Sequence, residues 1–316
     1  MPPLQDVDVR LCPLPSCRKC NNSDKRKDFC KDGICDIRSA LDDLPIRCVG
    51  QWANDKIFYL TRYFGIFAAG MHKCWAGKLY YIEVCSGPGR CSLRNGQEQD
   101  GTALAILNHP NSKYLRKAVF IDYSNVVVET LNQRINNLGQ TNARAVLGDY
   151  YDARSIVTAI GAEAKFGLSL CLIDPTDCSV PFSTVEAIYN ATGGKCDFVI
   201  SFFDKTDFGR NCAMAATLPT HQGLRSKYQR FLGDDSFFAR GDIVDLANRK
   251  DNNKIVEEFK NAYRERLCNL GLVFSDEVSV GSYYHLLFAT SNERGLDFWQ
   301  KANKKCTPDG QLLLPF

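Results

Sequence analysis

The feature that most constrains this chain is a series of short apolar runs, each followed by a stretch with helical periodicity. The runs are LYYIEVC (79–85), AVFID (118–122), ARAVLGD (143–149), LSLCLID (168–174) and DFVISFF (197–203). Near-continuous apolar runs of this length are typical of strands buried on both faces of a parallel sheet. The sequence therefore predicts an α/β fold in which parallel strands alternate with helices.

The end of the chain predicts one reversed strand. The apolar segments 272–280 and 283–290 are separated by Gly281 and Ser282, which is the pattern of an antiparallel hairpin. Five β–α units followed by a hairpin indicate a doubly wound, mostly parallel sheet. We therefore expect residues 39–316 to form a Rossmann-like domain that has a helical extension at its N-terminal side and an insertion around residues 203–250.

Composition places the chain among ordinary globular proteins. Its 316 residues are 45% hydrophobic and 24% charged, which excludes a collagen-like, coiled-coil or largely disordered chain. The net charge of +3 is too small to predict nucleic-acid binding by itself. No uncharged apolar run reaches the roughly 18 residues of a membrane helix, and the first residues lack the pattern of a signal peptide. We therefore expect a cytoplasmic protein that does not contact a membrane.

The sharpest motif, EVCSGPGRCS, follows the first of these strands. Gly87 and Gly89 allow a tight turn and a close approach of the backbone to a ligand. A dinucleotide site would have a third glycine at the position of Ser92. The alternative is the E/D-x-x-x-G-x-G pattern of Rossmann-like methyltransferases. In that pattern Glu83 is the acid, and the turn around Pro88 holds the amino-acid part of S-adenosylmethionine.

Acidic residues end the next two strands, in register with this turn. Asp122 ends the second strand and is predicted to accept hydrogen bonds from ribose hydroxyls, as an acid does in dinucleotide sites. Asp149 ends the third strand and is predicted to accept a hydrogen bond from the adenine amino group. Ligands of doubly wound sheets bind outside the carboxyl ends of the strands, where both residues fall. Acids at strand ends are also common as helix caps, so a purely structural role is the alternative.

The fourth strand ends in IDPTDCSVPF, where amino-group methyltransferases have an Asp-Pro-Pro-aromatic or Asn-Pro-Pro-aromatic turn. Asp174 and the proline after it match this turn, and Asp174 is predicted to orient the methyl acceptor or simply to end the strand. Thr176 and Asp177 replace the second proline and the aromatic residue, so this turn does not support base stacking. Asp177 is a second candidate catalytic residue. With Asp174, Asp204 and Asp207 it could instead form a carboxylate cluster for Mg²⁺, which makes a nuclease an alternative.

Five of the fifteen cysteines lie within residues 12–35, in a segment with almost no periodic apolar pattern. Because such a segment cannot build a core, we expect residues 1–38 to be stapled by thiolates on a metal ion. The spacing favours zinc with one spare cysteine, while its C-x4-C-x2-C start also matches an iron–sulfur ligand set. Disulfides or unrelated thiols are further alternatives. The candidate ligands are Cys12, Cys17, Cys20, Cys30 and Cys35.

Several segments, in order along the chain, resemble the three-Cys-motif partner proteins (TcmP). The resemblance covers roughly residues 45–302 and is moderately specific, because linked motifs occur in the same order. The segments are VGQWANDKIFYLTRYFGIF (49–67), YIEVCSGPGR (81–90), DGTALAIL (100–107), VFIDYSNVVVETLNQRI (119–135), IDPTDCSVPFSTVEAI (173–188), RFLGDD (230–235) and YHLLFATSNERGLDFW (284–299).

The resemblance implies a class I methyltransferase-like domain whose glycine turn is residues 87–89 and whose acidic strand ends are Glu83, Asp122 and Asp174. It also implies a partner, a three-Cys-motif protein encoded nearby. The family usually has an aromatic–glycine turn where this chain has a Thr-Asp pair, and its name refers to the cysteines of the partner. We therefore predict an S-adenosylmethionine-dependent methyltransferase, with nucleic acid as a candidate acceptor. A non-catalytic adaptor subunit and a metal-dependent nuclease are the alternatives.

Overall fold

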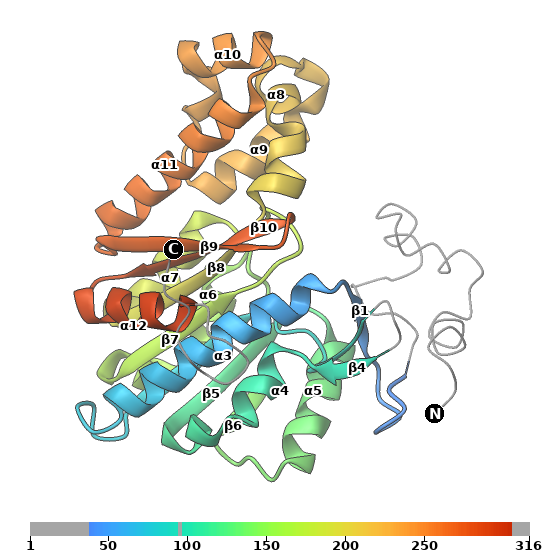
Figure 1. Ribbon diagram of the computed structural model, residues 1–316, viewed down its shortest axis with the longest axis vertical. Helices are drawn as coiled ribbons and strands as arrows, with labels where there is room; N and C mark the ends of the chain where they lie inside the picture. The colour runs from blue at the N-terminus through green and yellow to red at the C-terminus, as the bar shows by residue number, and fades with distance from the viewer. Residues whose placement is uncertain (1–37, 94–96, 305–316) are drawn as a thin grey trace.

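A seven-stranded sheet lies at the centre of the computed structural model, which describes residues 38–93 and 97–304 (Figure 1). The order of the strands across this sheet is β6-β5-β2-β7-β8-β10-β9. In chain order the strands are β2 (Leu79–Val84), β5 (Leu115–Asp122), β6 (Ala143–Leu147), β7 (Leu168–Ile173), β8 (Cys196–Phe202), β9 (Phe274–Val280) and β10 (Tyr284–Thr290).

The direction of the strands confirms the predicted sheet. The five strands from β6 to β8 pair in parallel, and β10 is antiparallel to both of its neighbours, β8 and β9. The chain starts in the middle of the sheet at β2, runs outward to β6 and then crosses back to β7. The order therefore reverses between β2 and β7, and the carboxyl ends of strands on either side of such a switch point open a crevice.

Helices cover both faces of the sheet because alternate residues of its central strand enter different cores. Leu79 and Tyr81 of β2 pack in one core with α3 (Trp52–Met71), α4 (Thr102–Leu107), α5 (Asn125–Asn137) and α12 (Glu293–Asn303). The next residues, Tyr80 and Ile82, pack in a second core with α6 (Ala153–Ile160), α7 (Phe182–Ala191) and α11 (Asn252–Leu270). This two-faced burial explains why the strand is apolar at nearly every position.

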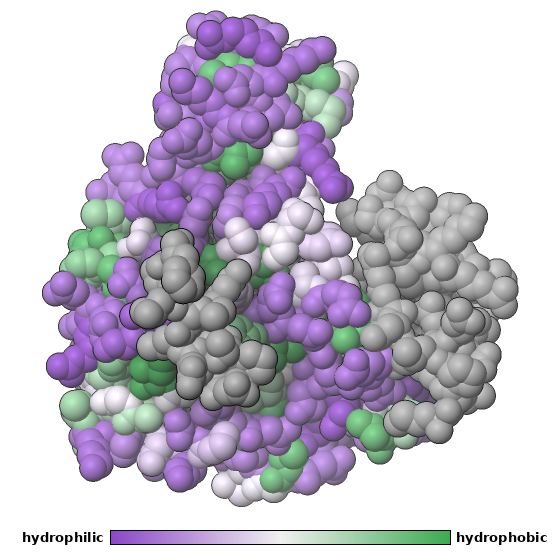
Figure 2. Space-filling view, viewed as in Figure 1, coloured by the Kyte–Doolittle hydropathy of each residue, from purple (hydrophilic) through white to green (hydrophobic). Residues whose placement is uncertain are grey.

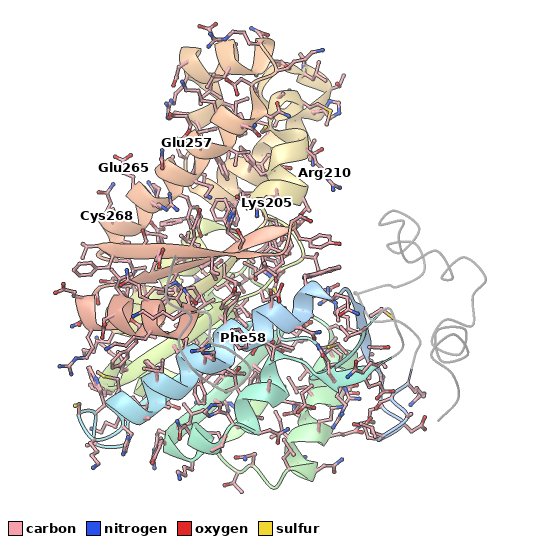
Figure 3. All side chains as sticks on the ribbon, in the orientation of Figure 1. Phe58, Lys205, Arg210, Glu257, Glu265 and Cys268 are labelled. Atoms are coloured by element: carbon pink, nitrogen blue, oxygen red, sulfur yellow. The ribbon has the colours of Figure 1, made fainter. Side chains whose placement is uncertain are left out.

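The chain between β8 and α11 forms a layer of helices beyond β10 (Figure 1), and we call residues 204–250 the helical cap. The cap begins with the π-turn η5 (Asp204–Phe208) and continues through α8 (Gly209–Thr217), α9 (Gln222–Leu232) and α10 (Gly241–Asn248). Aromatic rings fill it, and Phe208 stacks on Phe259 of α11 with 3.8 Å between centroids. Its outer surface is mainly hydrophilic (Figure 2). At its base Lys205 donates hydrogen bonds to Ser279 and to the carbonyl of Gly281, next to β10 (Figure 3).

A second, small sheet was not predicted. It consists of β1 (Arg47–Val49), β3 (Arg90–Leu93) and β4 (Glu98–Asp100), and β1 lies parallel to β3. The segment after the glycine turn, which reads as a polar connection, therefore begins with a buried strand. The pairing brings the chain that precedes α3 against the turn.

The third strand was expected to be buried on both faces. This is wrong for β6, where Arg144 and Leu147 are exposed because β5 is its only neighbour in the sheet.

The predicted metal-binding cysteines, Cys12 to Cys35, lie outside the described residues. No helix within residues 38–93 and 97–304 is long and apolar enough to cross a membrane. The remaining helical turns are η3 (Pro110–Tyr114), η4 (Ala162–Phe166), η6 (Pro219–His221) and η7 (Phe237–Ala239).

Candidate functional site

A pocket of about 700 Å³ lies at the carboxyl edge of β2 and β7, where the strand order reverses. Most of its lining comes from four parts of the chain, which are β1 with the start of α3, the glycine turn after β2, the turn after β7, and the helical cap. The volume falls within the range of about 300–1,000 Å³ that is usual for small-molecule sites. The pocket is therefore large enough for a ligand of nucleoside size together with part of a second reactant.

The two glycines of the turn have different roles. Both have positive φ, +66° at Gly87 and +89° at Gly89. A Cβ placed on Gly87 would meet no atom within 4 Å, so the space above this residue is open to the pocket. A Cβ on Gly89 would lie 2.8 Å from Leu131 of α5 and 3.1 Å from Leu104 of α4. Gly87 therefore offers bare backbone to a ligand, whereas Gly89 lets two helices pack against the turn.

Asp122 lies beneath the turn and holds it in place. Its Oδ2 accepts a hydrogen bond from the backbone N–H of Gly87 at 3.1 Å, and its Oδ1 accepts one from that of Ser124 at 3.2 Å. The residue is only 7% exposed and is not among those that line the pocket. Burial raises the pKa of its carboxyl group. Each oxygen retains a second acceptor site, so contact with a ribose hydroxyl stays a prediction.

The structure does not bring Glu83 or Asp149 to the pocket wall. Glu83 is fully buried, where it accepts hydrogen bonds from Thr102 Oγ1 and from the Tyr81 hydroxyl, the latter at 2.8 Å. Burial raises the pKa of Glu83 to about 8. Asp149 is exposed and accepts a hydrogen bond from the backbone N–H of Tyr151 at 2.8 Å. Their contacts with a cofactor stay predictions, and what the structure shows of Glu83 is a link between β2 and α4.

Asp174 and Asp177 both line the pocket, and each has a lysine beside it. Asp174 forms an ion pair with Lys56 of α3 and accepts a hydrogen bond of 2.5 Å from Ser201 Oγ at the end of β8. Asp177 lies 3.4 Å from the ammonium group of Lys227. Neighbouring side chains therefore hold both carboxylates in place just after the carboxyl end of β7.

The four-carboxylate cluster considered above does not form. Asp207 joins Asp177 through Lys227, whose ammonium group lies 2.8 Å from Asp207 Oδ2. Asp204 lies elsewhere, with its Oδ2 2.6 Å from His285 Nδ1, which agrees with a structural role for that histidine. In the part of the chain that the structure describes, no three His, Cys, Asp or Glu side chains are grouped so that they could hold a metal ion.

Sequence reasoning missed most of the pocket wall. Basic side chains line it, and aromatic rings do so as well, including the stacked pair Phe203 and Tyr284 with centroids 4.5 Å apart. Arg90 lies within the glycine-turn motif, but the other residues belong to no local motif and come from separate elements. One indication of these residues was available from the sequence. Residues 49–67, just before and within α3, belong to the segments that resemble the three-Cys-motif partner proteins. The missed basic residues are Arg47, Lys56, Arg90 and Lys227.

Comparison with known proteins finds only distant structural likeness. No family model matches the chain, and no curated protein matches it. Solved structures with partial likeness include an O-methyltransferase family protein from Burkholderia thailandensis (12% identity, 72% of this chain and 60% of that chain, TM-score 0.36). The same holds for a Podospora anserina methyltransferase with bound SAH (10% identity, 72% of this chain and 76% of that chain, TM-score 0.36). It also holds for the magnesium protoporphyrin IX methyltransferase of Synechocystis with bound SAH (14% identity, 73% of this chain and 83% of that chain, TM-score 0.35). At these identities and scores the likeness carries no argument about function, which depends on the pocket itself.

Proposed function

We propose that this protein is an S-adenosylmethionine-dependent methyltransferase. The observation that carries the proposal is the open space above Gly87, inside a pocket of about 700 Å³ at the switch point of the sheet. Backbone without a side chain, at the end of the first strand of a doubly wound sheet, is where such folds bind nucleotide-type ligands. When bound there, S-adenosylmethionine supplies an electrophilic methyl group on its sulfonium.

The residues around the turn fit such a ligand. Gly87 and Pro88 present backbone to the pocket, and Tyr123, which is 53% exposed, lies on the pocket wall after β5. An aromatic ring at this edge gives a purine a surface on which to stack. Asp122 fixes the backbone of the turn from below, so the cradle is formed before a ligand enters.

Methyl transfer depends chiefly on holding donor and acceptor in line, so the residues that matter most are those that position the acceptor. Asp174 is the best candidate for this role. It lines the pocket beside the start of the turn, where its backbone N–H donates a hydrogen bond of 3.1 Å to the carbonyl of Val84, and its side chain is fixed by Lys56 and Ser201. A carboxylate fixed in this way can accept a hydrogen bond from an amine or hydroxyl and orient its lone pair.

Calorimetry with S-adenosylmethionine and S-adenosylhomocysteine tests the proposal. We expect both to bind the folded protein, and we expect Asp174→Asn to keep S-adenosylhomocysteine binding while losing transfer of a labelled methyl group. Candidate acceptors for this assay are RNA, DNA and protein from a cell extract. If neither adenosyl compound binds protein that is shown to be folded, the proposal is wrong.

One observation favours a second candidate, a non-catalytic adaptor subunit. Both oxygens of Asp174 are already engaged, by Lys56 and by Ser201, so this carboxylate is used within the protein itself. An adaptor would retain full biological activity after Asp174→Ala. The nuclease alternative gains no support, because Asp174, Asp177 and Asp207 each have a lysine where a metal-dependent site would have a cation.

The partner follows from the resemblance to three-Cys-motif partner proteins, and nucleic acid as the acceptor is a separate part of the same proposal. Basic and aromatic side chains on the pocket wall support nucleic acid as an acceptor. Co-purification with a three-Cys-motif protein encoded beside the gene tests the partner. X-ray fluorescence of the purified full chain tests for zinc or iron on the candidate ligands Cys12 to Cys35.

A further inference from the structure

Lys56 brings an ammonium group to the pocket from the second turn of α3. Its side chain is only 16% exposed and forms an ion pair with Asp174, the one salt bridge that it makes among the residues described. An ammonium group has three N–H donors, and the contact with Asp174 uses one of them. Two donors therefore remain at a partly buried point of the pocket wall, where a bound group can accept hydrogen bonds from them.

Lys56 and Asp174 act on the same point of the pocket. The ammonium group of Lys56 holds Oδ2 of Asp174, and Oδ1 accepts the hydrogen bond of 2.5 Å from Ser201. Each carboxylate oxygen keeps a second acceptor site, so Asp174 can still accept a hydrogen bond from a group in the pocket. Because the carboxylate and the ammonium group are in direct contact, an atom placed against Oδ2 also lies next to a strong donor.

This combination of donor and acceptor distinguishes an oxygen from a nitrogen as the methylated atom. A hydroxyl oxygen has two lone pairs and one hydrogen. It can direct one lone pair at the methyl group, accept a hydrogen bond from Lys56 with the other, and donate its hydrogen to Asp174. An amine nitrogen has a single lone pair, which it needs for the attack, so it would leave the N–H donors of Lys56 unpaired. The cation also opposes the positive charge that a nitrogen acquires during transfer, whereas it stabilises negative charge on an oxygen.

We propose that the methyl acceptor is a hydroxyl oxygen that Lys56 and Asp174 bind together. This inference rests on the proposed function and names the class of its acceptor. The oxygen forms a bond to the methyl carbon while the bond from that carbon to sulfur breaks, and the electron pair of the broken bond stays on the sulfur. The hydroxyl proton passes to Asp174 and from there to water. Lys56 is then a catalytic residue, because it touches the reacting oxygen and stabilises its charge as the proton leaves.

The aromatic residues beside Lys56 favour a nucleoside as the carrier of this hydroxyl. Trp52 lies one turn before Lys56 on α3 and lines the pocket. Its ring centroid is 4.4 Å from that of Tyr283, which is 38% exposed. Rings at a pocket mouth give a base a surface on which to stack. Because RNA has a hydroxyl on every sugar and DNA does not, the proposed acceptor is the ribose 2′-hydroxyl of RNA.

Methyl transfer to RNA tests the identity of the acceptor atom. The full chain is incubated with S-adenosylmethionine labelled in its methyl group and with total RNA, and the RNA is then hydrolysed in alkali. A 2′-O-methyl group blocks cleavage of the adjacent phosphodiester, so we expect the label in dinucleotides that resist alkali. Label in single nucleotides would place the methyl group on a base and overturn the inference. Label only in DNA or protein, supplied in parallel, would also overturn it.

Binding to two oligonucleotide pools of random sequence, one of RNA and one of DNA, gives a test that does not depend on turnover. With S-adenosylhomocysteine bound, we expect wild-type protein to bind the RNA about 10-fold more tightly than the DNA. Lys56→Met should bind both pools equally, while its affinity for S-adenosylhomocysteine changes less than about twofold. Lys56→Arg keeps the ion pair with Asp174 and part of the preference for RNA. Lys78→Met, at an exposed lysine outside the pocket, is the matched control and has no effect.

The comparison of RNA with DNA uses the wild-type chain, so a folding defect in a variant does not affect it. Equal affinity of wild type for the two pools overturns the inference, and so does a preference for RNA that Lys56→Met retains in full. Either failure leaves the proposed function intact, because S-adenosylhomocysteine still binds. If wild-type protein binds neither S-adenosylmethionine nor S-adenosylhomocysteine, the proposed function fails as well, and that result is seen before any oligonucleotide is added.

Discussion

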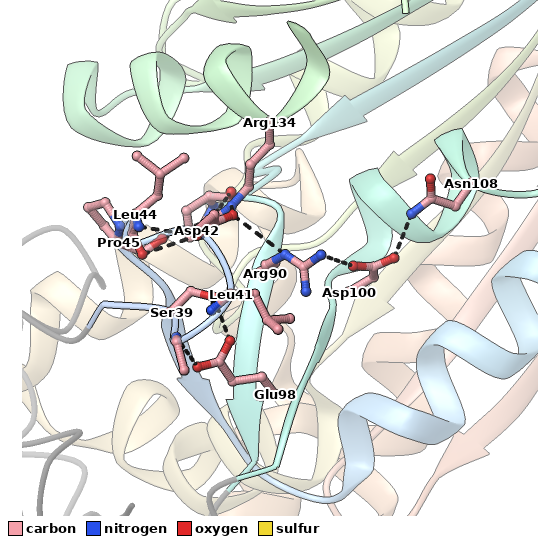
Figure 4. A network of polar contacts seen from close by, with 12 residues as sticks. Ser39, Leu41, Asp42, Leu44, Pro45, Arg90, Glu98, Asp100, Asn108 and Arg134 are labelled. Atoms are coloured by element: carbon pink, nitrogen blue, oxygen red, sulfur yellow. Dashed lines mark hydrogen bonds and ion pairs between the residues drawn. The ribbon is translucent and has the colours of Figure 1, made fainter. Parts of the chain in front are cut away.

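The guanidinium of Arg134 donates a hydrogen bond of 2.6 Å to the carbonyl oxygen of Pro88, at the centre of the glycine turn. The same residue, which is 3% exposed, donates to the carbonyl of Pro45 and to both oxygens of Asp42 (Figure 4). One residue of α5 therefore ties the turn to the segment that leads into β1. Because residues of β1 and of the turn both line the pocket, two parts of its wall depend on the same buried side chain.

Arg134→Met should destabilise the protein strongly, since it keeps most of the packing volume but leaves the Pro88 carbonyl without this donor and Asp42 with only Arg90 and the backbone N–H of Leu44. We expect a loss of about 3–5 kcal/mol in the free energy of unfolding, measured by denaturant titration. Lys301→Met is the control, because it breaks an exposed ion pair with Asp297 and should change stability by less than about 0.5 kcal/mol. Equal effects of the two variants would contradict the role given to Arg134.

The two glycines of the turn should respond differently to alanine. Gly87→Ala adds a Cβ that meets no protein atom but enters the pocket, at a cost of about 1–2 kcal/mol for its positive φ. We expect a folded protein that has lost most of its affinity for S-adenosylhomocysteine. Gly89→Ala has the same kind of backbone strain and also clashes with Leu131 and Leu104, so we expect a larger fall in the thermal midpoint. Normal ligand binding by Gly87→Ala would show that the open space is not where the ligand lies.

The sheet could be predicted because local pattern determines it. Runs such as LYYIEVC are apolar at nearly every position only where helices cover both faces, and the Gly281–Ser282 break predicts the reversal into β10. The glycine turn and Asp174 were correctly expected at the same edge, because carboxyl ends of parallel strands meet there. These predictions needed no knowledge of contacts between distant segments.

The rest of the pocket could not be predicted because it is made by such contacts. Lys56 reads as an ordinary solvated lysine near the start of a helix until the fold brings it to Asp174, 118 positions later in the chain. Arg47 reaches the turn only through the pairing of β1 with β3. Glu83 looked like a ligand-binding acid, but Tyr81, two residues earlier on the same side of β2, turns it into an internal hydrogen-bond partner.

Lys227 should fasten the helical cap to the pocket. Its ammonium group lies 2.8 Å from Asp207 Oδ2 at the start of the cap and 3.4 Å from Asp177 after β7. Lys227→Met should leave these two carboxylates close together without a cation and weaken the protein by about 1.5–3 kcal/mol. Hydrogen exchange followed by mass spectrometry should show faster exchange in residues 204–232 than in wild type, with β2 unchanged. Uniformly faster exchange would mean that the lysine supports the whole fold and not the cap.

Glu83 should make stability fall as the pH rises through neutrality. Burial raises its pKa in the folded protein to about 8, above the value of 4.5 for a free glutamate. Between these two values the unfolded chain has lost the proton that the folded chain keeps, so ionisation favours the unfolded state. The free energy of unfolding should therefore decrease by up to about 1.4 kcal/mol for each pH unit from 4.5 to 8 and then level off.

The variant Glu83→Gln tests this directly, because an amide keeps the shape of the neutral acid. Its oxygen can accept a hydrogen bond from one of the hydroxyls of Thr102 and Tyr81, and its NH2 can donate one to the other. In denaturant titrations at pH 5, 6.5 and 8, the free energy of unfolding of the variant should increase relative to that of wild type as the pH rises. Glu163→Gln is the control of opposite sign, because the hydrogen bond from Lys117 lowers the pKa of Glu163. That ion pair stabilises the fold above pH 4.5 and is lost in acid, so this variant gains nothing between pH 5 and 8. A constant difference between Glu83→Gln and wild type over this range would mean that Glu83 is ionised in the folded protein, and that the interior beneath the glycine turn holds a charge.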